Sequence, residues 1–127
     1  MPVPVRGEAR LRRAERFERA DYRRIFDEGR SYPARYFVLW VAQATDGAAR
    51  FGAVVSKRTF PLAVQRNRAR RLMREAYRLS KGGLMEGFHL MLLGRRRLVD
   101  STTRRDDIIR DFASVCRRAG VWKGGAR

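Results

Sequence analysis

The chain carries a dense run of arginine side chains that could bind phosphate groups. The stretch from residue 56 to 75 reads SKRTFPLAVQRNRARRLMRE, and its arginines recur at spacings of one to three residues from position 66 onward. A guanidinium group binds phosphate through two parallel hydrogen bonds, so repeated arginines on one surface suit a polyanion. The cationic and polar positions that we assign to such a surface are Arg66, Asn67, Arg68, Arg70, Arg71, Arg74 and Arg78.

These arginines fall on one side of a predicted helix, from about residue 64 to 79. At about 100° per residue, Ala69, Leu72, Met73 and Ala76 share one side, and most of the arginines lie opposite. Like charges at such spacing destabilise an isolated helix, a cost that bound phosphates would offset. A solvated basic face without a partner is the alternative. The one-sidedness of the charges favours a nucleic-acid face.

Three aromatic side chains could supply the second half of a nucleic-acid site. Tyr22 and Phe26 lie one turn apart on a predicted helix over residues 19 to 28, and Trp40 lies on a predicted strand over residues 36 to 43. Unstacked bases bind to aromatic rings, so these residues would form a stacking platform if they converge on an open groove. Plain core packing is the alternative, and it suffices for Phe26 taken alone.

The composition agrees with a polyanionic partner. The 127 residues include 30 Lys and Arg against 13 Asp and Glu, for a net charge of +17, and all but three of the basic residues are arginines. Nucleic acid is therefore the default partner, and an anionic membrane surface is the second candidate. No apolar run approaches the length of a membrane span, and the first residues lack the apolar core of a signal peptide. We expect a cytoplasmic protein that does not associate with membranes.

The sequence offers no catalytic or metal-binding constellation of its own. Cys116 and His89 are the only cysteine and the only histidine, so neither an internal disulfide nor a cysteine-based metal site can form. His89 lies in an apolar predicted strand, where we expect a hydrogen-bonded structural role. Asp106, Asp107 and Asp111 fall near the start of a predicted helix, where the helix dipole explains them. We assign no catalytic residue and no metal ligand.

Strands must position the aromatic residues and the basic helix. Besides the strand over residues 36 to 43, we predict a return strand over 50 to 55 and a short strand near 30 to 32. Thr45-Asp46-Gly47 predicts a hairpin turn between the two longer strands. The segment over 88 to 93 is apolar throughout, which predicts a central strand.

A last helix and two terminal segments complete the predicted domain. The helix covers residues 103 to 119, with Ser101, Thr102 and Thr103 as candidate caps. Its apolar positions predict packing against a small sheet, which gives an α+β domain. The organisation that we expect is a flexible arm over 1–15, a single RNA-binding domain over 16–120 and a tail over 121–127.

With its elements placed, the chain resembles the bacterial ribonuclease P protein family. The basic helix contains the family's Arg-Asn-Arg core at residues 66–68, followed by an arginine pair at 70–71, and Ser56-Lys57-Arg58 matches its strand end. The family often has lysine where this chain has Arg70, and the charge is kept. Two further features match the family: an aromatic helix that ends at Gly29 and a strand with the sequence Phe-Val-Leu-Trp. The resemblance covers about residues 15 to 120.

The resemblance implies both a fold and a function. The family fold is a two-layer α+β sandwich in the order α-β-β-β-α-β-α, ribosomal-protein-S5-domain-2-like, with a left-handed βαβ crossover through the basic helix. The family's holoenzyme is an endoribonuclease that removes the 5′ leader from precursor tRNA. Its catalytic RNA subunit carries the chemistry, with Mg²⁺ bound mainly by that RNA and the substrate. The protein would be an accessory subunit.

The resemblance also assigns roles to the residues above. The seven polar and cationic residues of the basic helix, from Arg66 to Arg78, would bind the RNA subunit. A ribosomal-protein-like RNA-binding protein without a processing role is the first alternative, and a DNA-coating protein is the second. The residues that would line a cleft for the single-stranded leader are Tyr22, Phe26, Trp40, Lys57 and Arg58.

Overall fold

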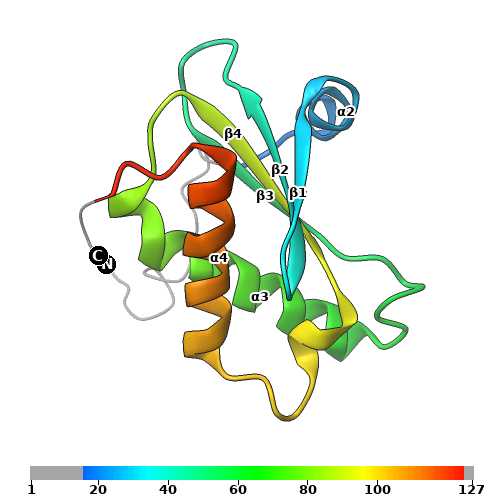
Figure 1. The fold of residues 1–127 in the computed structure, drawn as a ribbon. Coiled ribbons are helices and arrows are strands. Elements are labelled where there is room, and N and C mark those ends of the chain that lie inside the picture. Colours follow the sequence, from blue (N-terminus) through cyan, green and yellow to red (C-terminus); the bar gives the residue numbers. More distant parts are fainter. Residues whose placement is uncertain (1–15, 125–127) are drawn as a thin grey trace, which may run out of the picture.

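The structure is a computed structural model that describes residues 16–124, and the predicted arm lies outside these residues. The order of helices and strands follows the prediction (Figure 1). Two 3-10 turns, η2 (Lys81–Gly83) and η3 (Arg96–Val99), lie before and after the strand β4 (Phe88–Gly94). The main elements are α2 (Arg19–Glu28), β1 (Arg30–Pro33), β2 (Phe37–Gln43), β3 (Arg50–Val54), α3 (Ala63–Ser80), β4 (Phe88–Gly94) and α4 (Arg105–Ala119).

The strands form one sheet in which β4 is central. The order is β1-β2-β4-β3, and β4 pairs antiparallel with β2 and parallel with β3. Leu90 of β4 thus lies opposite Val41 on one side and Phe51 on the other. A strand with neighbours on both sides and helices on both faces must be apolar along its length. The predicted central position of this strand is confirmed.

The predicted hairpin between the second and third strands is wrong. The chain does turn at Thr45-Asp46-Gly47, where Gly47 adopts a φ of 77°, but β4 lies between β2 and β3. Turn residues specify a change of direction and not which strands pair. The uniformly apolar β4 gains most from the central place, because both of its faces are buried there. The hairpin of this sheet joins β1 to β2, with Arg30 opposite Val41.

Helices cover both faces of the sheet, to different extents (Figure 1). α3 and α4 pack on one face and enclose the main core, which includes Phe37, Leu39 and Phe112. The chain passes from β3 through α3 to β4, its parallel neighbour, as the predicted crossover requires. α2 crosses the opposite face, where Ile25 packs with Ala42 and Met91. The α+β sandwich is confirmed, and part of the α2 side of the sheet is left less covered.

The last helix begins later than predicted, and its predicted caps are wrong. α4 follows Arg104, which forms no side-chain capping bond. Thr103 instead donates its hydroxyl to the carbonyl oxygen of Arg97 at 2.7 Å, which closes the preceding loop. The helix ends at Gly120, whose φ of 79° is left-handed and favours glycine. Its predicted apolar face is confirmed by the burial of Ile108, Phe112, Val115 and Cys116.

The chain after α4 docks on the domain as far as it is described. Trp122 forms a bridge with Leu84, and the Arg117 guanidinium lies 5.6 Å from the Trp122 ring centroid. The Trp122 ring is so close to Gly83 that a Cβ there would overlap it. The part of the predicted tail that the structure describes is therefore held on the domain by Trp122.

Candidate nucleic-acid interface

α3 turns a cationic side outward, as its period predicts. Ala69, Met73 and Ala76 are buried, and so is Tyr77, whose ring stacks on Phe51 with centroids 4.4 Å apart. The opposite side of the helix is open to solvent. The predicted residues that are exposed there are Asn67, Arg68, Arg71 and Arg74, and those that are half-buried at its margins are Arg66, Arg70 and Arg78.

The α3 arginines are not neutralised by carboxylates of the described residues. Among residues 16–124, none of these arginines forms an ion pair, and Glu75 pairs instead with Arg105 of α4 at 2.9 Å. Arg66 donates to the carbonyl oxygens of residues 60 and 61 at 2.8 and 3.0 Å, so it also fixes the loop before the helix. Arg70 donates to the side-chain oxygen of Asn67 at 3.1 Å. The remaining charges are available to an anionic partner.

α2 brings the predicted aromatic residues together on the less covered part of the sheet. Ile25 is buried and anchors the helix, whereas Phe26 is 43% exposed. The Phe26 ring packs edge-on against Trp40 of β2, with centroids 5.0 Å apart. Tyr22 packs in the same way against Phe17, also at 5.0 Å. Tyr22 and Trp40 pack against the same small cluster around Ile25 and Met91, and Phe26 joins it through Trp40. Phe26 is therefore not a plain core residue.

An apolar row continues this surface across the sheet. Val38, Leu93 and Val54 lie side by side on β2, β4 and β3, on the same face as Trp40, and each is only half-buried. The Trp40 ring N–H is buried and has no acceptor among the described residues, so packing alone holds the ring. We call this surface the aromatic groove. Its residues are Tyr22 and Phe26 of α2, Trp40, Val38, Leu93 and Val54 of the sheet, and Arg70 and Arg74 of α3.

Arg70 and Arg74 belong to the groove because their charges act on Tyr22. Burial raises the pKa of the Tyr22 hydroxyl, and the positive charges of Arg74 and Arg70 oppose that rise. Burial and the charge of Arg16 lower the pKa of Arg74. Charges affect a neighbour strongly only over short distances. The two arginines are thus near enough to Tyr22 for their charges to act on its hydroxyl group.

Lys57 and Arg58 extend the cationic surface at one end of the groove. Both side chains are exposed on the loop between β3 and α3. The loop follows Val54, the last residue of β3 and a member of the apolar row. The predicted cleft residues therefore divide into an aromatic set on α2 and β2 and a cationic pair beyond the end of β3.

Sequence patterns did not identify three residues of this region. Phe17 is 9% exposed and packs on Tyr22, but it precedes the helix in a stretch without a clear period. Leu93 belongs to a uniformly apolar strand, where alternation gives no information about faces. Val54 could have been found, because alternation from Gly52 along a predicted strand assigns both residues to one face.

A side chain at Gly52 is expected to disturb the aromatic cluster. A Cβ there would lie 2.9 Å from ring atoms of Phe17 and Tyr22. Overpacking of this kind costs about 1–3 kcal/mol, so Gly52→Ala should lower the free energy of unfolding by that amount in urea denaturation. Gly82→Ala is the control, because a Cβ at Gly82 meets open space. Equal stability of the two variants would contradict the close packing over Gly52.

Comparisons with known proteins agree on one family. The family model described as Ribonuclease P matches residues 8–120. A ribonuclease P protein component from Chloroflexus aurantiacus is 39% identical over 110 residues, which are 84% of this chain and 81% of that protein. The one from Natranaerobius thermophilus is 42% identical over 76 residues, 60% of this chain and 65% of that protein.

Solved structures of the same kind share the fold. The Staphylococcus aureus RNase P protein superposes with a TM-score of 0.73 at 26% identity, covering 87% of this chain and 99% of that one. The Thermotoga maritima RNase P protein gives a TM-score of 0.73 at 29% identity, covering 82% and 96%.

Proposed function

The chain belongs to the family of ribonuclease P protein components, the protein subunits of an endoribonuclease, and we propose that it assists a catalytic RNA in removing the 5′ leader from precursor tRNA. In this proposal α3 binds the RNA subunit, and the aromatic groove holds the single-stranded leader. The observation that carries the proposal is that Tyr22, Phe26 and Trp40 lie together on one half-buried face of the sheet, with Arg70 and Arg74 near enough for their charges to act on Tyr22.

The groove combines two kinds of contact that a single strand can satisfy at once. Unstacked bases can bind the half-exposed aromatic and aliphatic side chains, because every base has an apolar face. Arg70 and Arg74 can bind the phosphates of the same strand, since guanidinium groups form paired hydrogen bonds with phosphate. A duplex hides its base faces by stacking. The groove therefore favours a flexible leader over paired RNA.

The outward side of α3 suits the backbone of a folded RNA. Arg68 and Arg71 are exposed, and no carboxylate pairs with them among residues 16–124. Each phosphate that such a residue neutralises releases condensed counterions, which makes the affinity fall with salt. We therefore assign Arg68 and Arg71 to the RNA subunit alone, and Arg70 and Arg74 to the border between that RNA and the leader.

Mg²⁺ is proposed to bind to the RNA subunit and the substrate and not to this protein. The arginines at the groove repel a divalent cation, and the nearest acid of α3, Glu75, is engaged by Arg105 at 2.9 Å. The protein's contribution is to neutralise phosphate charge and to position the substrate, which lowers the amount of Mg²⁺ that the RNA needs.

The proposed location is the cytoplasm, where both RNA partners are found. The helices described between residues 16 and 124 are all too short or too polar to cross a bilayer.

Reconstitution tests the proposed function. The chain is added to the cognate RNA subunit at Mg²⁺ concentrations at which that RNA alone is nearly inactive, and precursor-tRNA cleavage is followed. The proposal expects cleavage at the mature 5′ end to be restored. No restoration would favour the alternative of a ribosomal-protein-like binder. Comparable affinity for duplex DNA and for precursor tRNA would instead favour a DNA-coating protein.

A further inference from the structure

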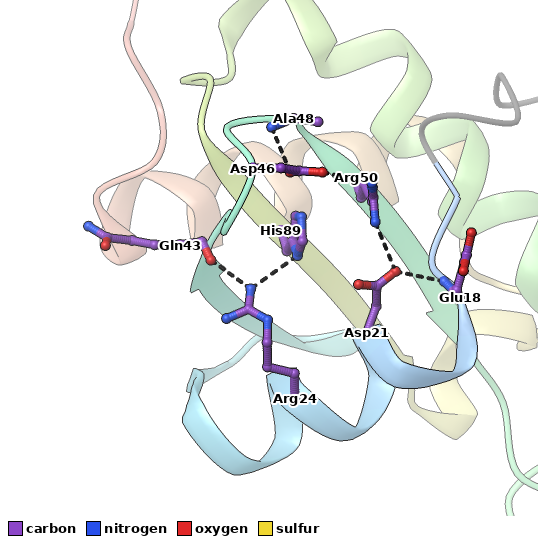
Figure 2. Close-up of polar contacts among 8 residues, drawn as sticks. All are labelled: Glu18, Asp21, Arg24, Gln43, Asp46, Ala48, Arg50 and His89. Carbon is purple, nitrogen blue, oxygen red and sulfur yellow. Dashed lines mark hydrogen bonds and ion pairs between the residues drawn. The ribbon is translucent and has the colours of Figure 1, made fainter.

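A polar cluster lies between α2 and the sheet, where Arg24 of the helix approaches His89 of β4 (Figure 2). Arg24 of α2 donates through Nη2 to the carbonyl oxygen of Gln43 at 2.6 Å, and the same atom lies 3.1 Å from Nδ1 of His89. Its Nη1 atom binds Glu28 of the same helix at 3.1 Å. Arg24 therefore links α2 to the end of β2 and to β4.

The Arg24 contact fixes the protonation of His89. An arginine can only donate hydrogen bonds, so the Nδ1 atom of His89 must be an unprotonated acceptor. The proton of the neutral ring then resides on Nε2, which is buried and has no acceptor among the described residues. The His89 side chain is 1% exposed, and its ring centroid lies 5.7 Å from that of Phe17. The arrangement requires the neutral ring.

The charges around His89 act in both directions. Burial and the positive charge of Arg24 lower the pKa of His89 below its ordinary value of 6.5, and Arg50 acts in the same sense. Asp21 and Asp46 raise it, but each is also bound to Arg50, at 3.4 and 2.9 Å. The ring is thus neutral at pH 7. Its contribution to stability is complete above pH 6.5 and is lost as the pH falls from there toward the lowered pKa.

The two flanks of α2 are mechanically linked through Ile25. At about 100° per residue, Asp21, Arg24 and Glu28 lie on one flank, Tyr22 and Phe26 lie on the other, and Ile25 points to the sheet between them. A buried apolar contact such as that of Ile25 resists separation of the helix from the sheet more strongly than it resists rotation of the helix about its own axis. The polar contacts therefore set the rotation of α2, and with it the position of the aromatic flank.

We propose that Arg24 and His89 are positioning residues for the leader: neutral His89 holds Arg24, Arg24 sets the rotation of α2, and protonation of His89 releases the aromatic flank and weakens leader binding. This inference rests on the proposed function, because it assumes that the aromatic groove binds the leader. A protonated ring would place an N–H and a positive charge against the Arg24 guanidinium, and the contact would break.

Two His89 variants distinguish the role of His89 as a hydrogen-bond acceptor from the effect of its protonation. His89→Asn keeps an acceptor oxygen at the position of Nδ1 and cannot be protonated, whereas His89→Leu removes the acceptor. The measurement is the affinity of the reconstituted holoenzyme for a cleavage-resistant precursor tRNA, divided by its affinity for mature tRNA, at pH 7.5 and pH 5.0. The division removes pH effects on the RNA subunit and the tRNA body.

Once His89 is protonated, the wild-type ratio is expected to fall about tenfold or more, the range for losing one hydrogen bond to a charged group. His89→Asn should match the wild type at pH 7.5 and change less than about twofold at pH 5.0, since the asparagine amide does not titrate. His89→Leu should already be lowered at pH 7.5 and stay constant with pH. Arg24→Met should behave like His89→Leu. Arg23 is exposed on the same helix, so Arg23→Met makes the same change of charge and is the control. It should behave like the wild type.

The outcomes distinguish the inference from the proposed function. If the wild type does not prefer precursor to mature tRNA even at pH 7.5, the proposed leader groove is wrong. If the preference is present but His89→Leu and Arg24→Met retain it, or His89→Asn loses it with pH as the wild type does, the positioning role is wrong and the groove stands.

Discussion

Trp40→Ala is expected to weaken holoenzyme binding to precursor tRNA by about 1–3 kcal/mol, the usual loss when an aromatic ring that stacks on a base is removed. Binding to mature tRNA should change little, because mature tRNA has no leader to occupy the groove. Trp40 suits this role because its ring is only half-buried and packs edge-on with Phe26 at 5.0 Å. Titration of the holoenzyme with each labelled tRNA gives the two affinities.

Trp40→Phe is the matched control for that experiment. Phenylalanine keeps an aromatic face beside Phe26 and removes a buried ring N–H that has no acceptor among the described residues. Removing an unsatisfied buried donor costs nothing in hydrogen bonding, so urea denaturation should show stability within about 1 kcal/mol of the wild type. Precursor binding should be largely retained. Equal losses for both tRNAs in Trp40→Ala would make Trp40 a core residue without a role in the groove.

Replacing Arg70 and Arg74 together by alanine is expected to have the largest effect on RNA affinity. Hydrogen bonds to charged groups contribute about 1.5–3 kcal/mol each, so a loss of roughly 100-fold or more is expected at low salt. The plot of log affinity against log salt should also lose about one unit of slope for each phosphate contact removed. Filter binding of the RNA subunit over a range of KCl concentrations measures both quantities.

The control removes the same charge from a surface outside the groove. Arg23 of α2 and Arg30 of β1 are exposed and lie outside the groove, and their double alanine variant keeps the aromatic flank intact. That variant should lose affinity only through net charge, with a small change of slope. A slope that is unchanged in the Arg70 and Arg74 variant, or equal in the two variants, would show that Arg70 and Arg74 make no specific phosphate contacts.

Local periodicity predicts the basic helix well because its physical cause is local. Ala69, Met73 and Ala76 must share one side of any helix over this stretch, and that side is the buried one. The same holds for Tyr22, Ile25 and Phe26 on α2. Trp40 and Val38 likewise share a face because alternation along a strand is a property of the backbone. The candidate site was therefore predictable wherever it depends on the geometry of one element.

Features that depend on distant parts of the chain were not predictable in this way. The insertion of β4 between β2 and β3 is decided by competition for burial among all four strands, not by the turn at Thr45-Asp46-Gly47. The same is true of Arg70 and Arg74, whose approach to Tyr22 depends on where α3 and α2 cross the sheet. The Arg24–His89 contact joins residues from α2 and β4, and no pattern within either segment indicates it.

The affinity of the holoenzyme for precursors with successively longer 5′ leaders tests the central claim most directly. The affinity is expected to rise with each added nucleotide until the groove is filled and then to stay constant. The RNA subunit alone, and the holoenzyme with Trp40→Ala, should show a weaker dependence on leader length. Affinities that do not change with leader length in the wild-type holoenzyme would contradict the account.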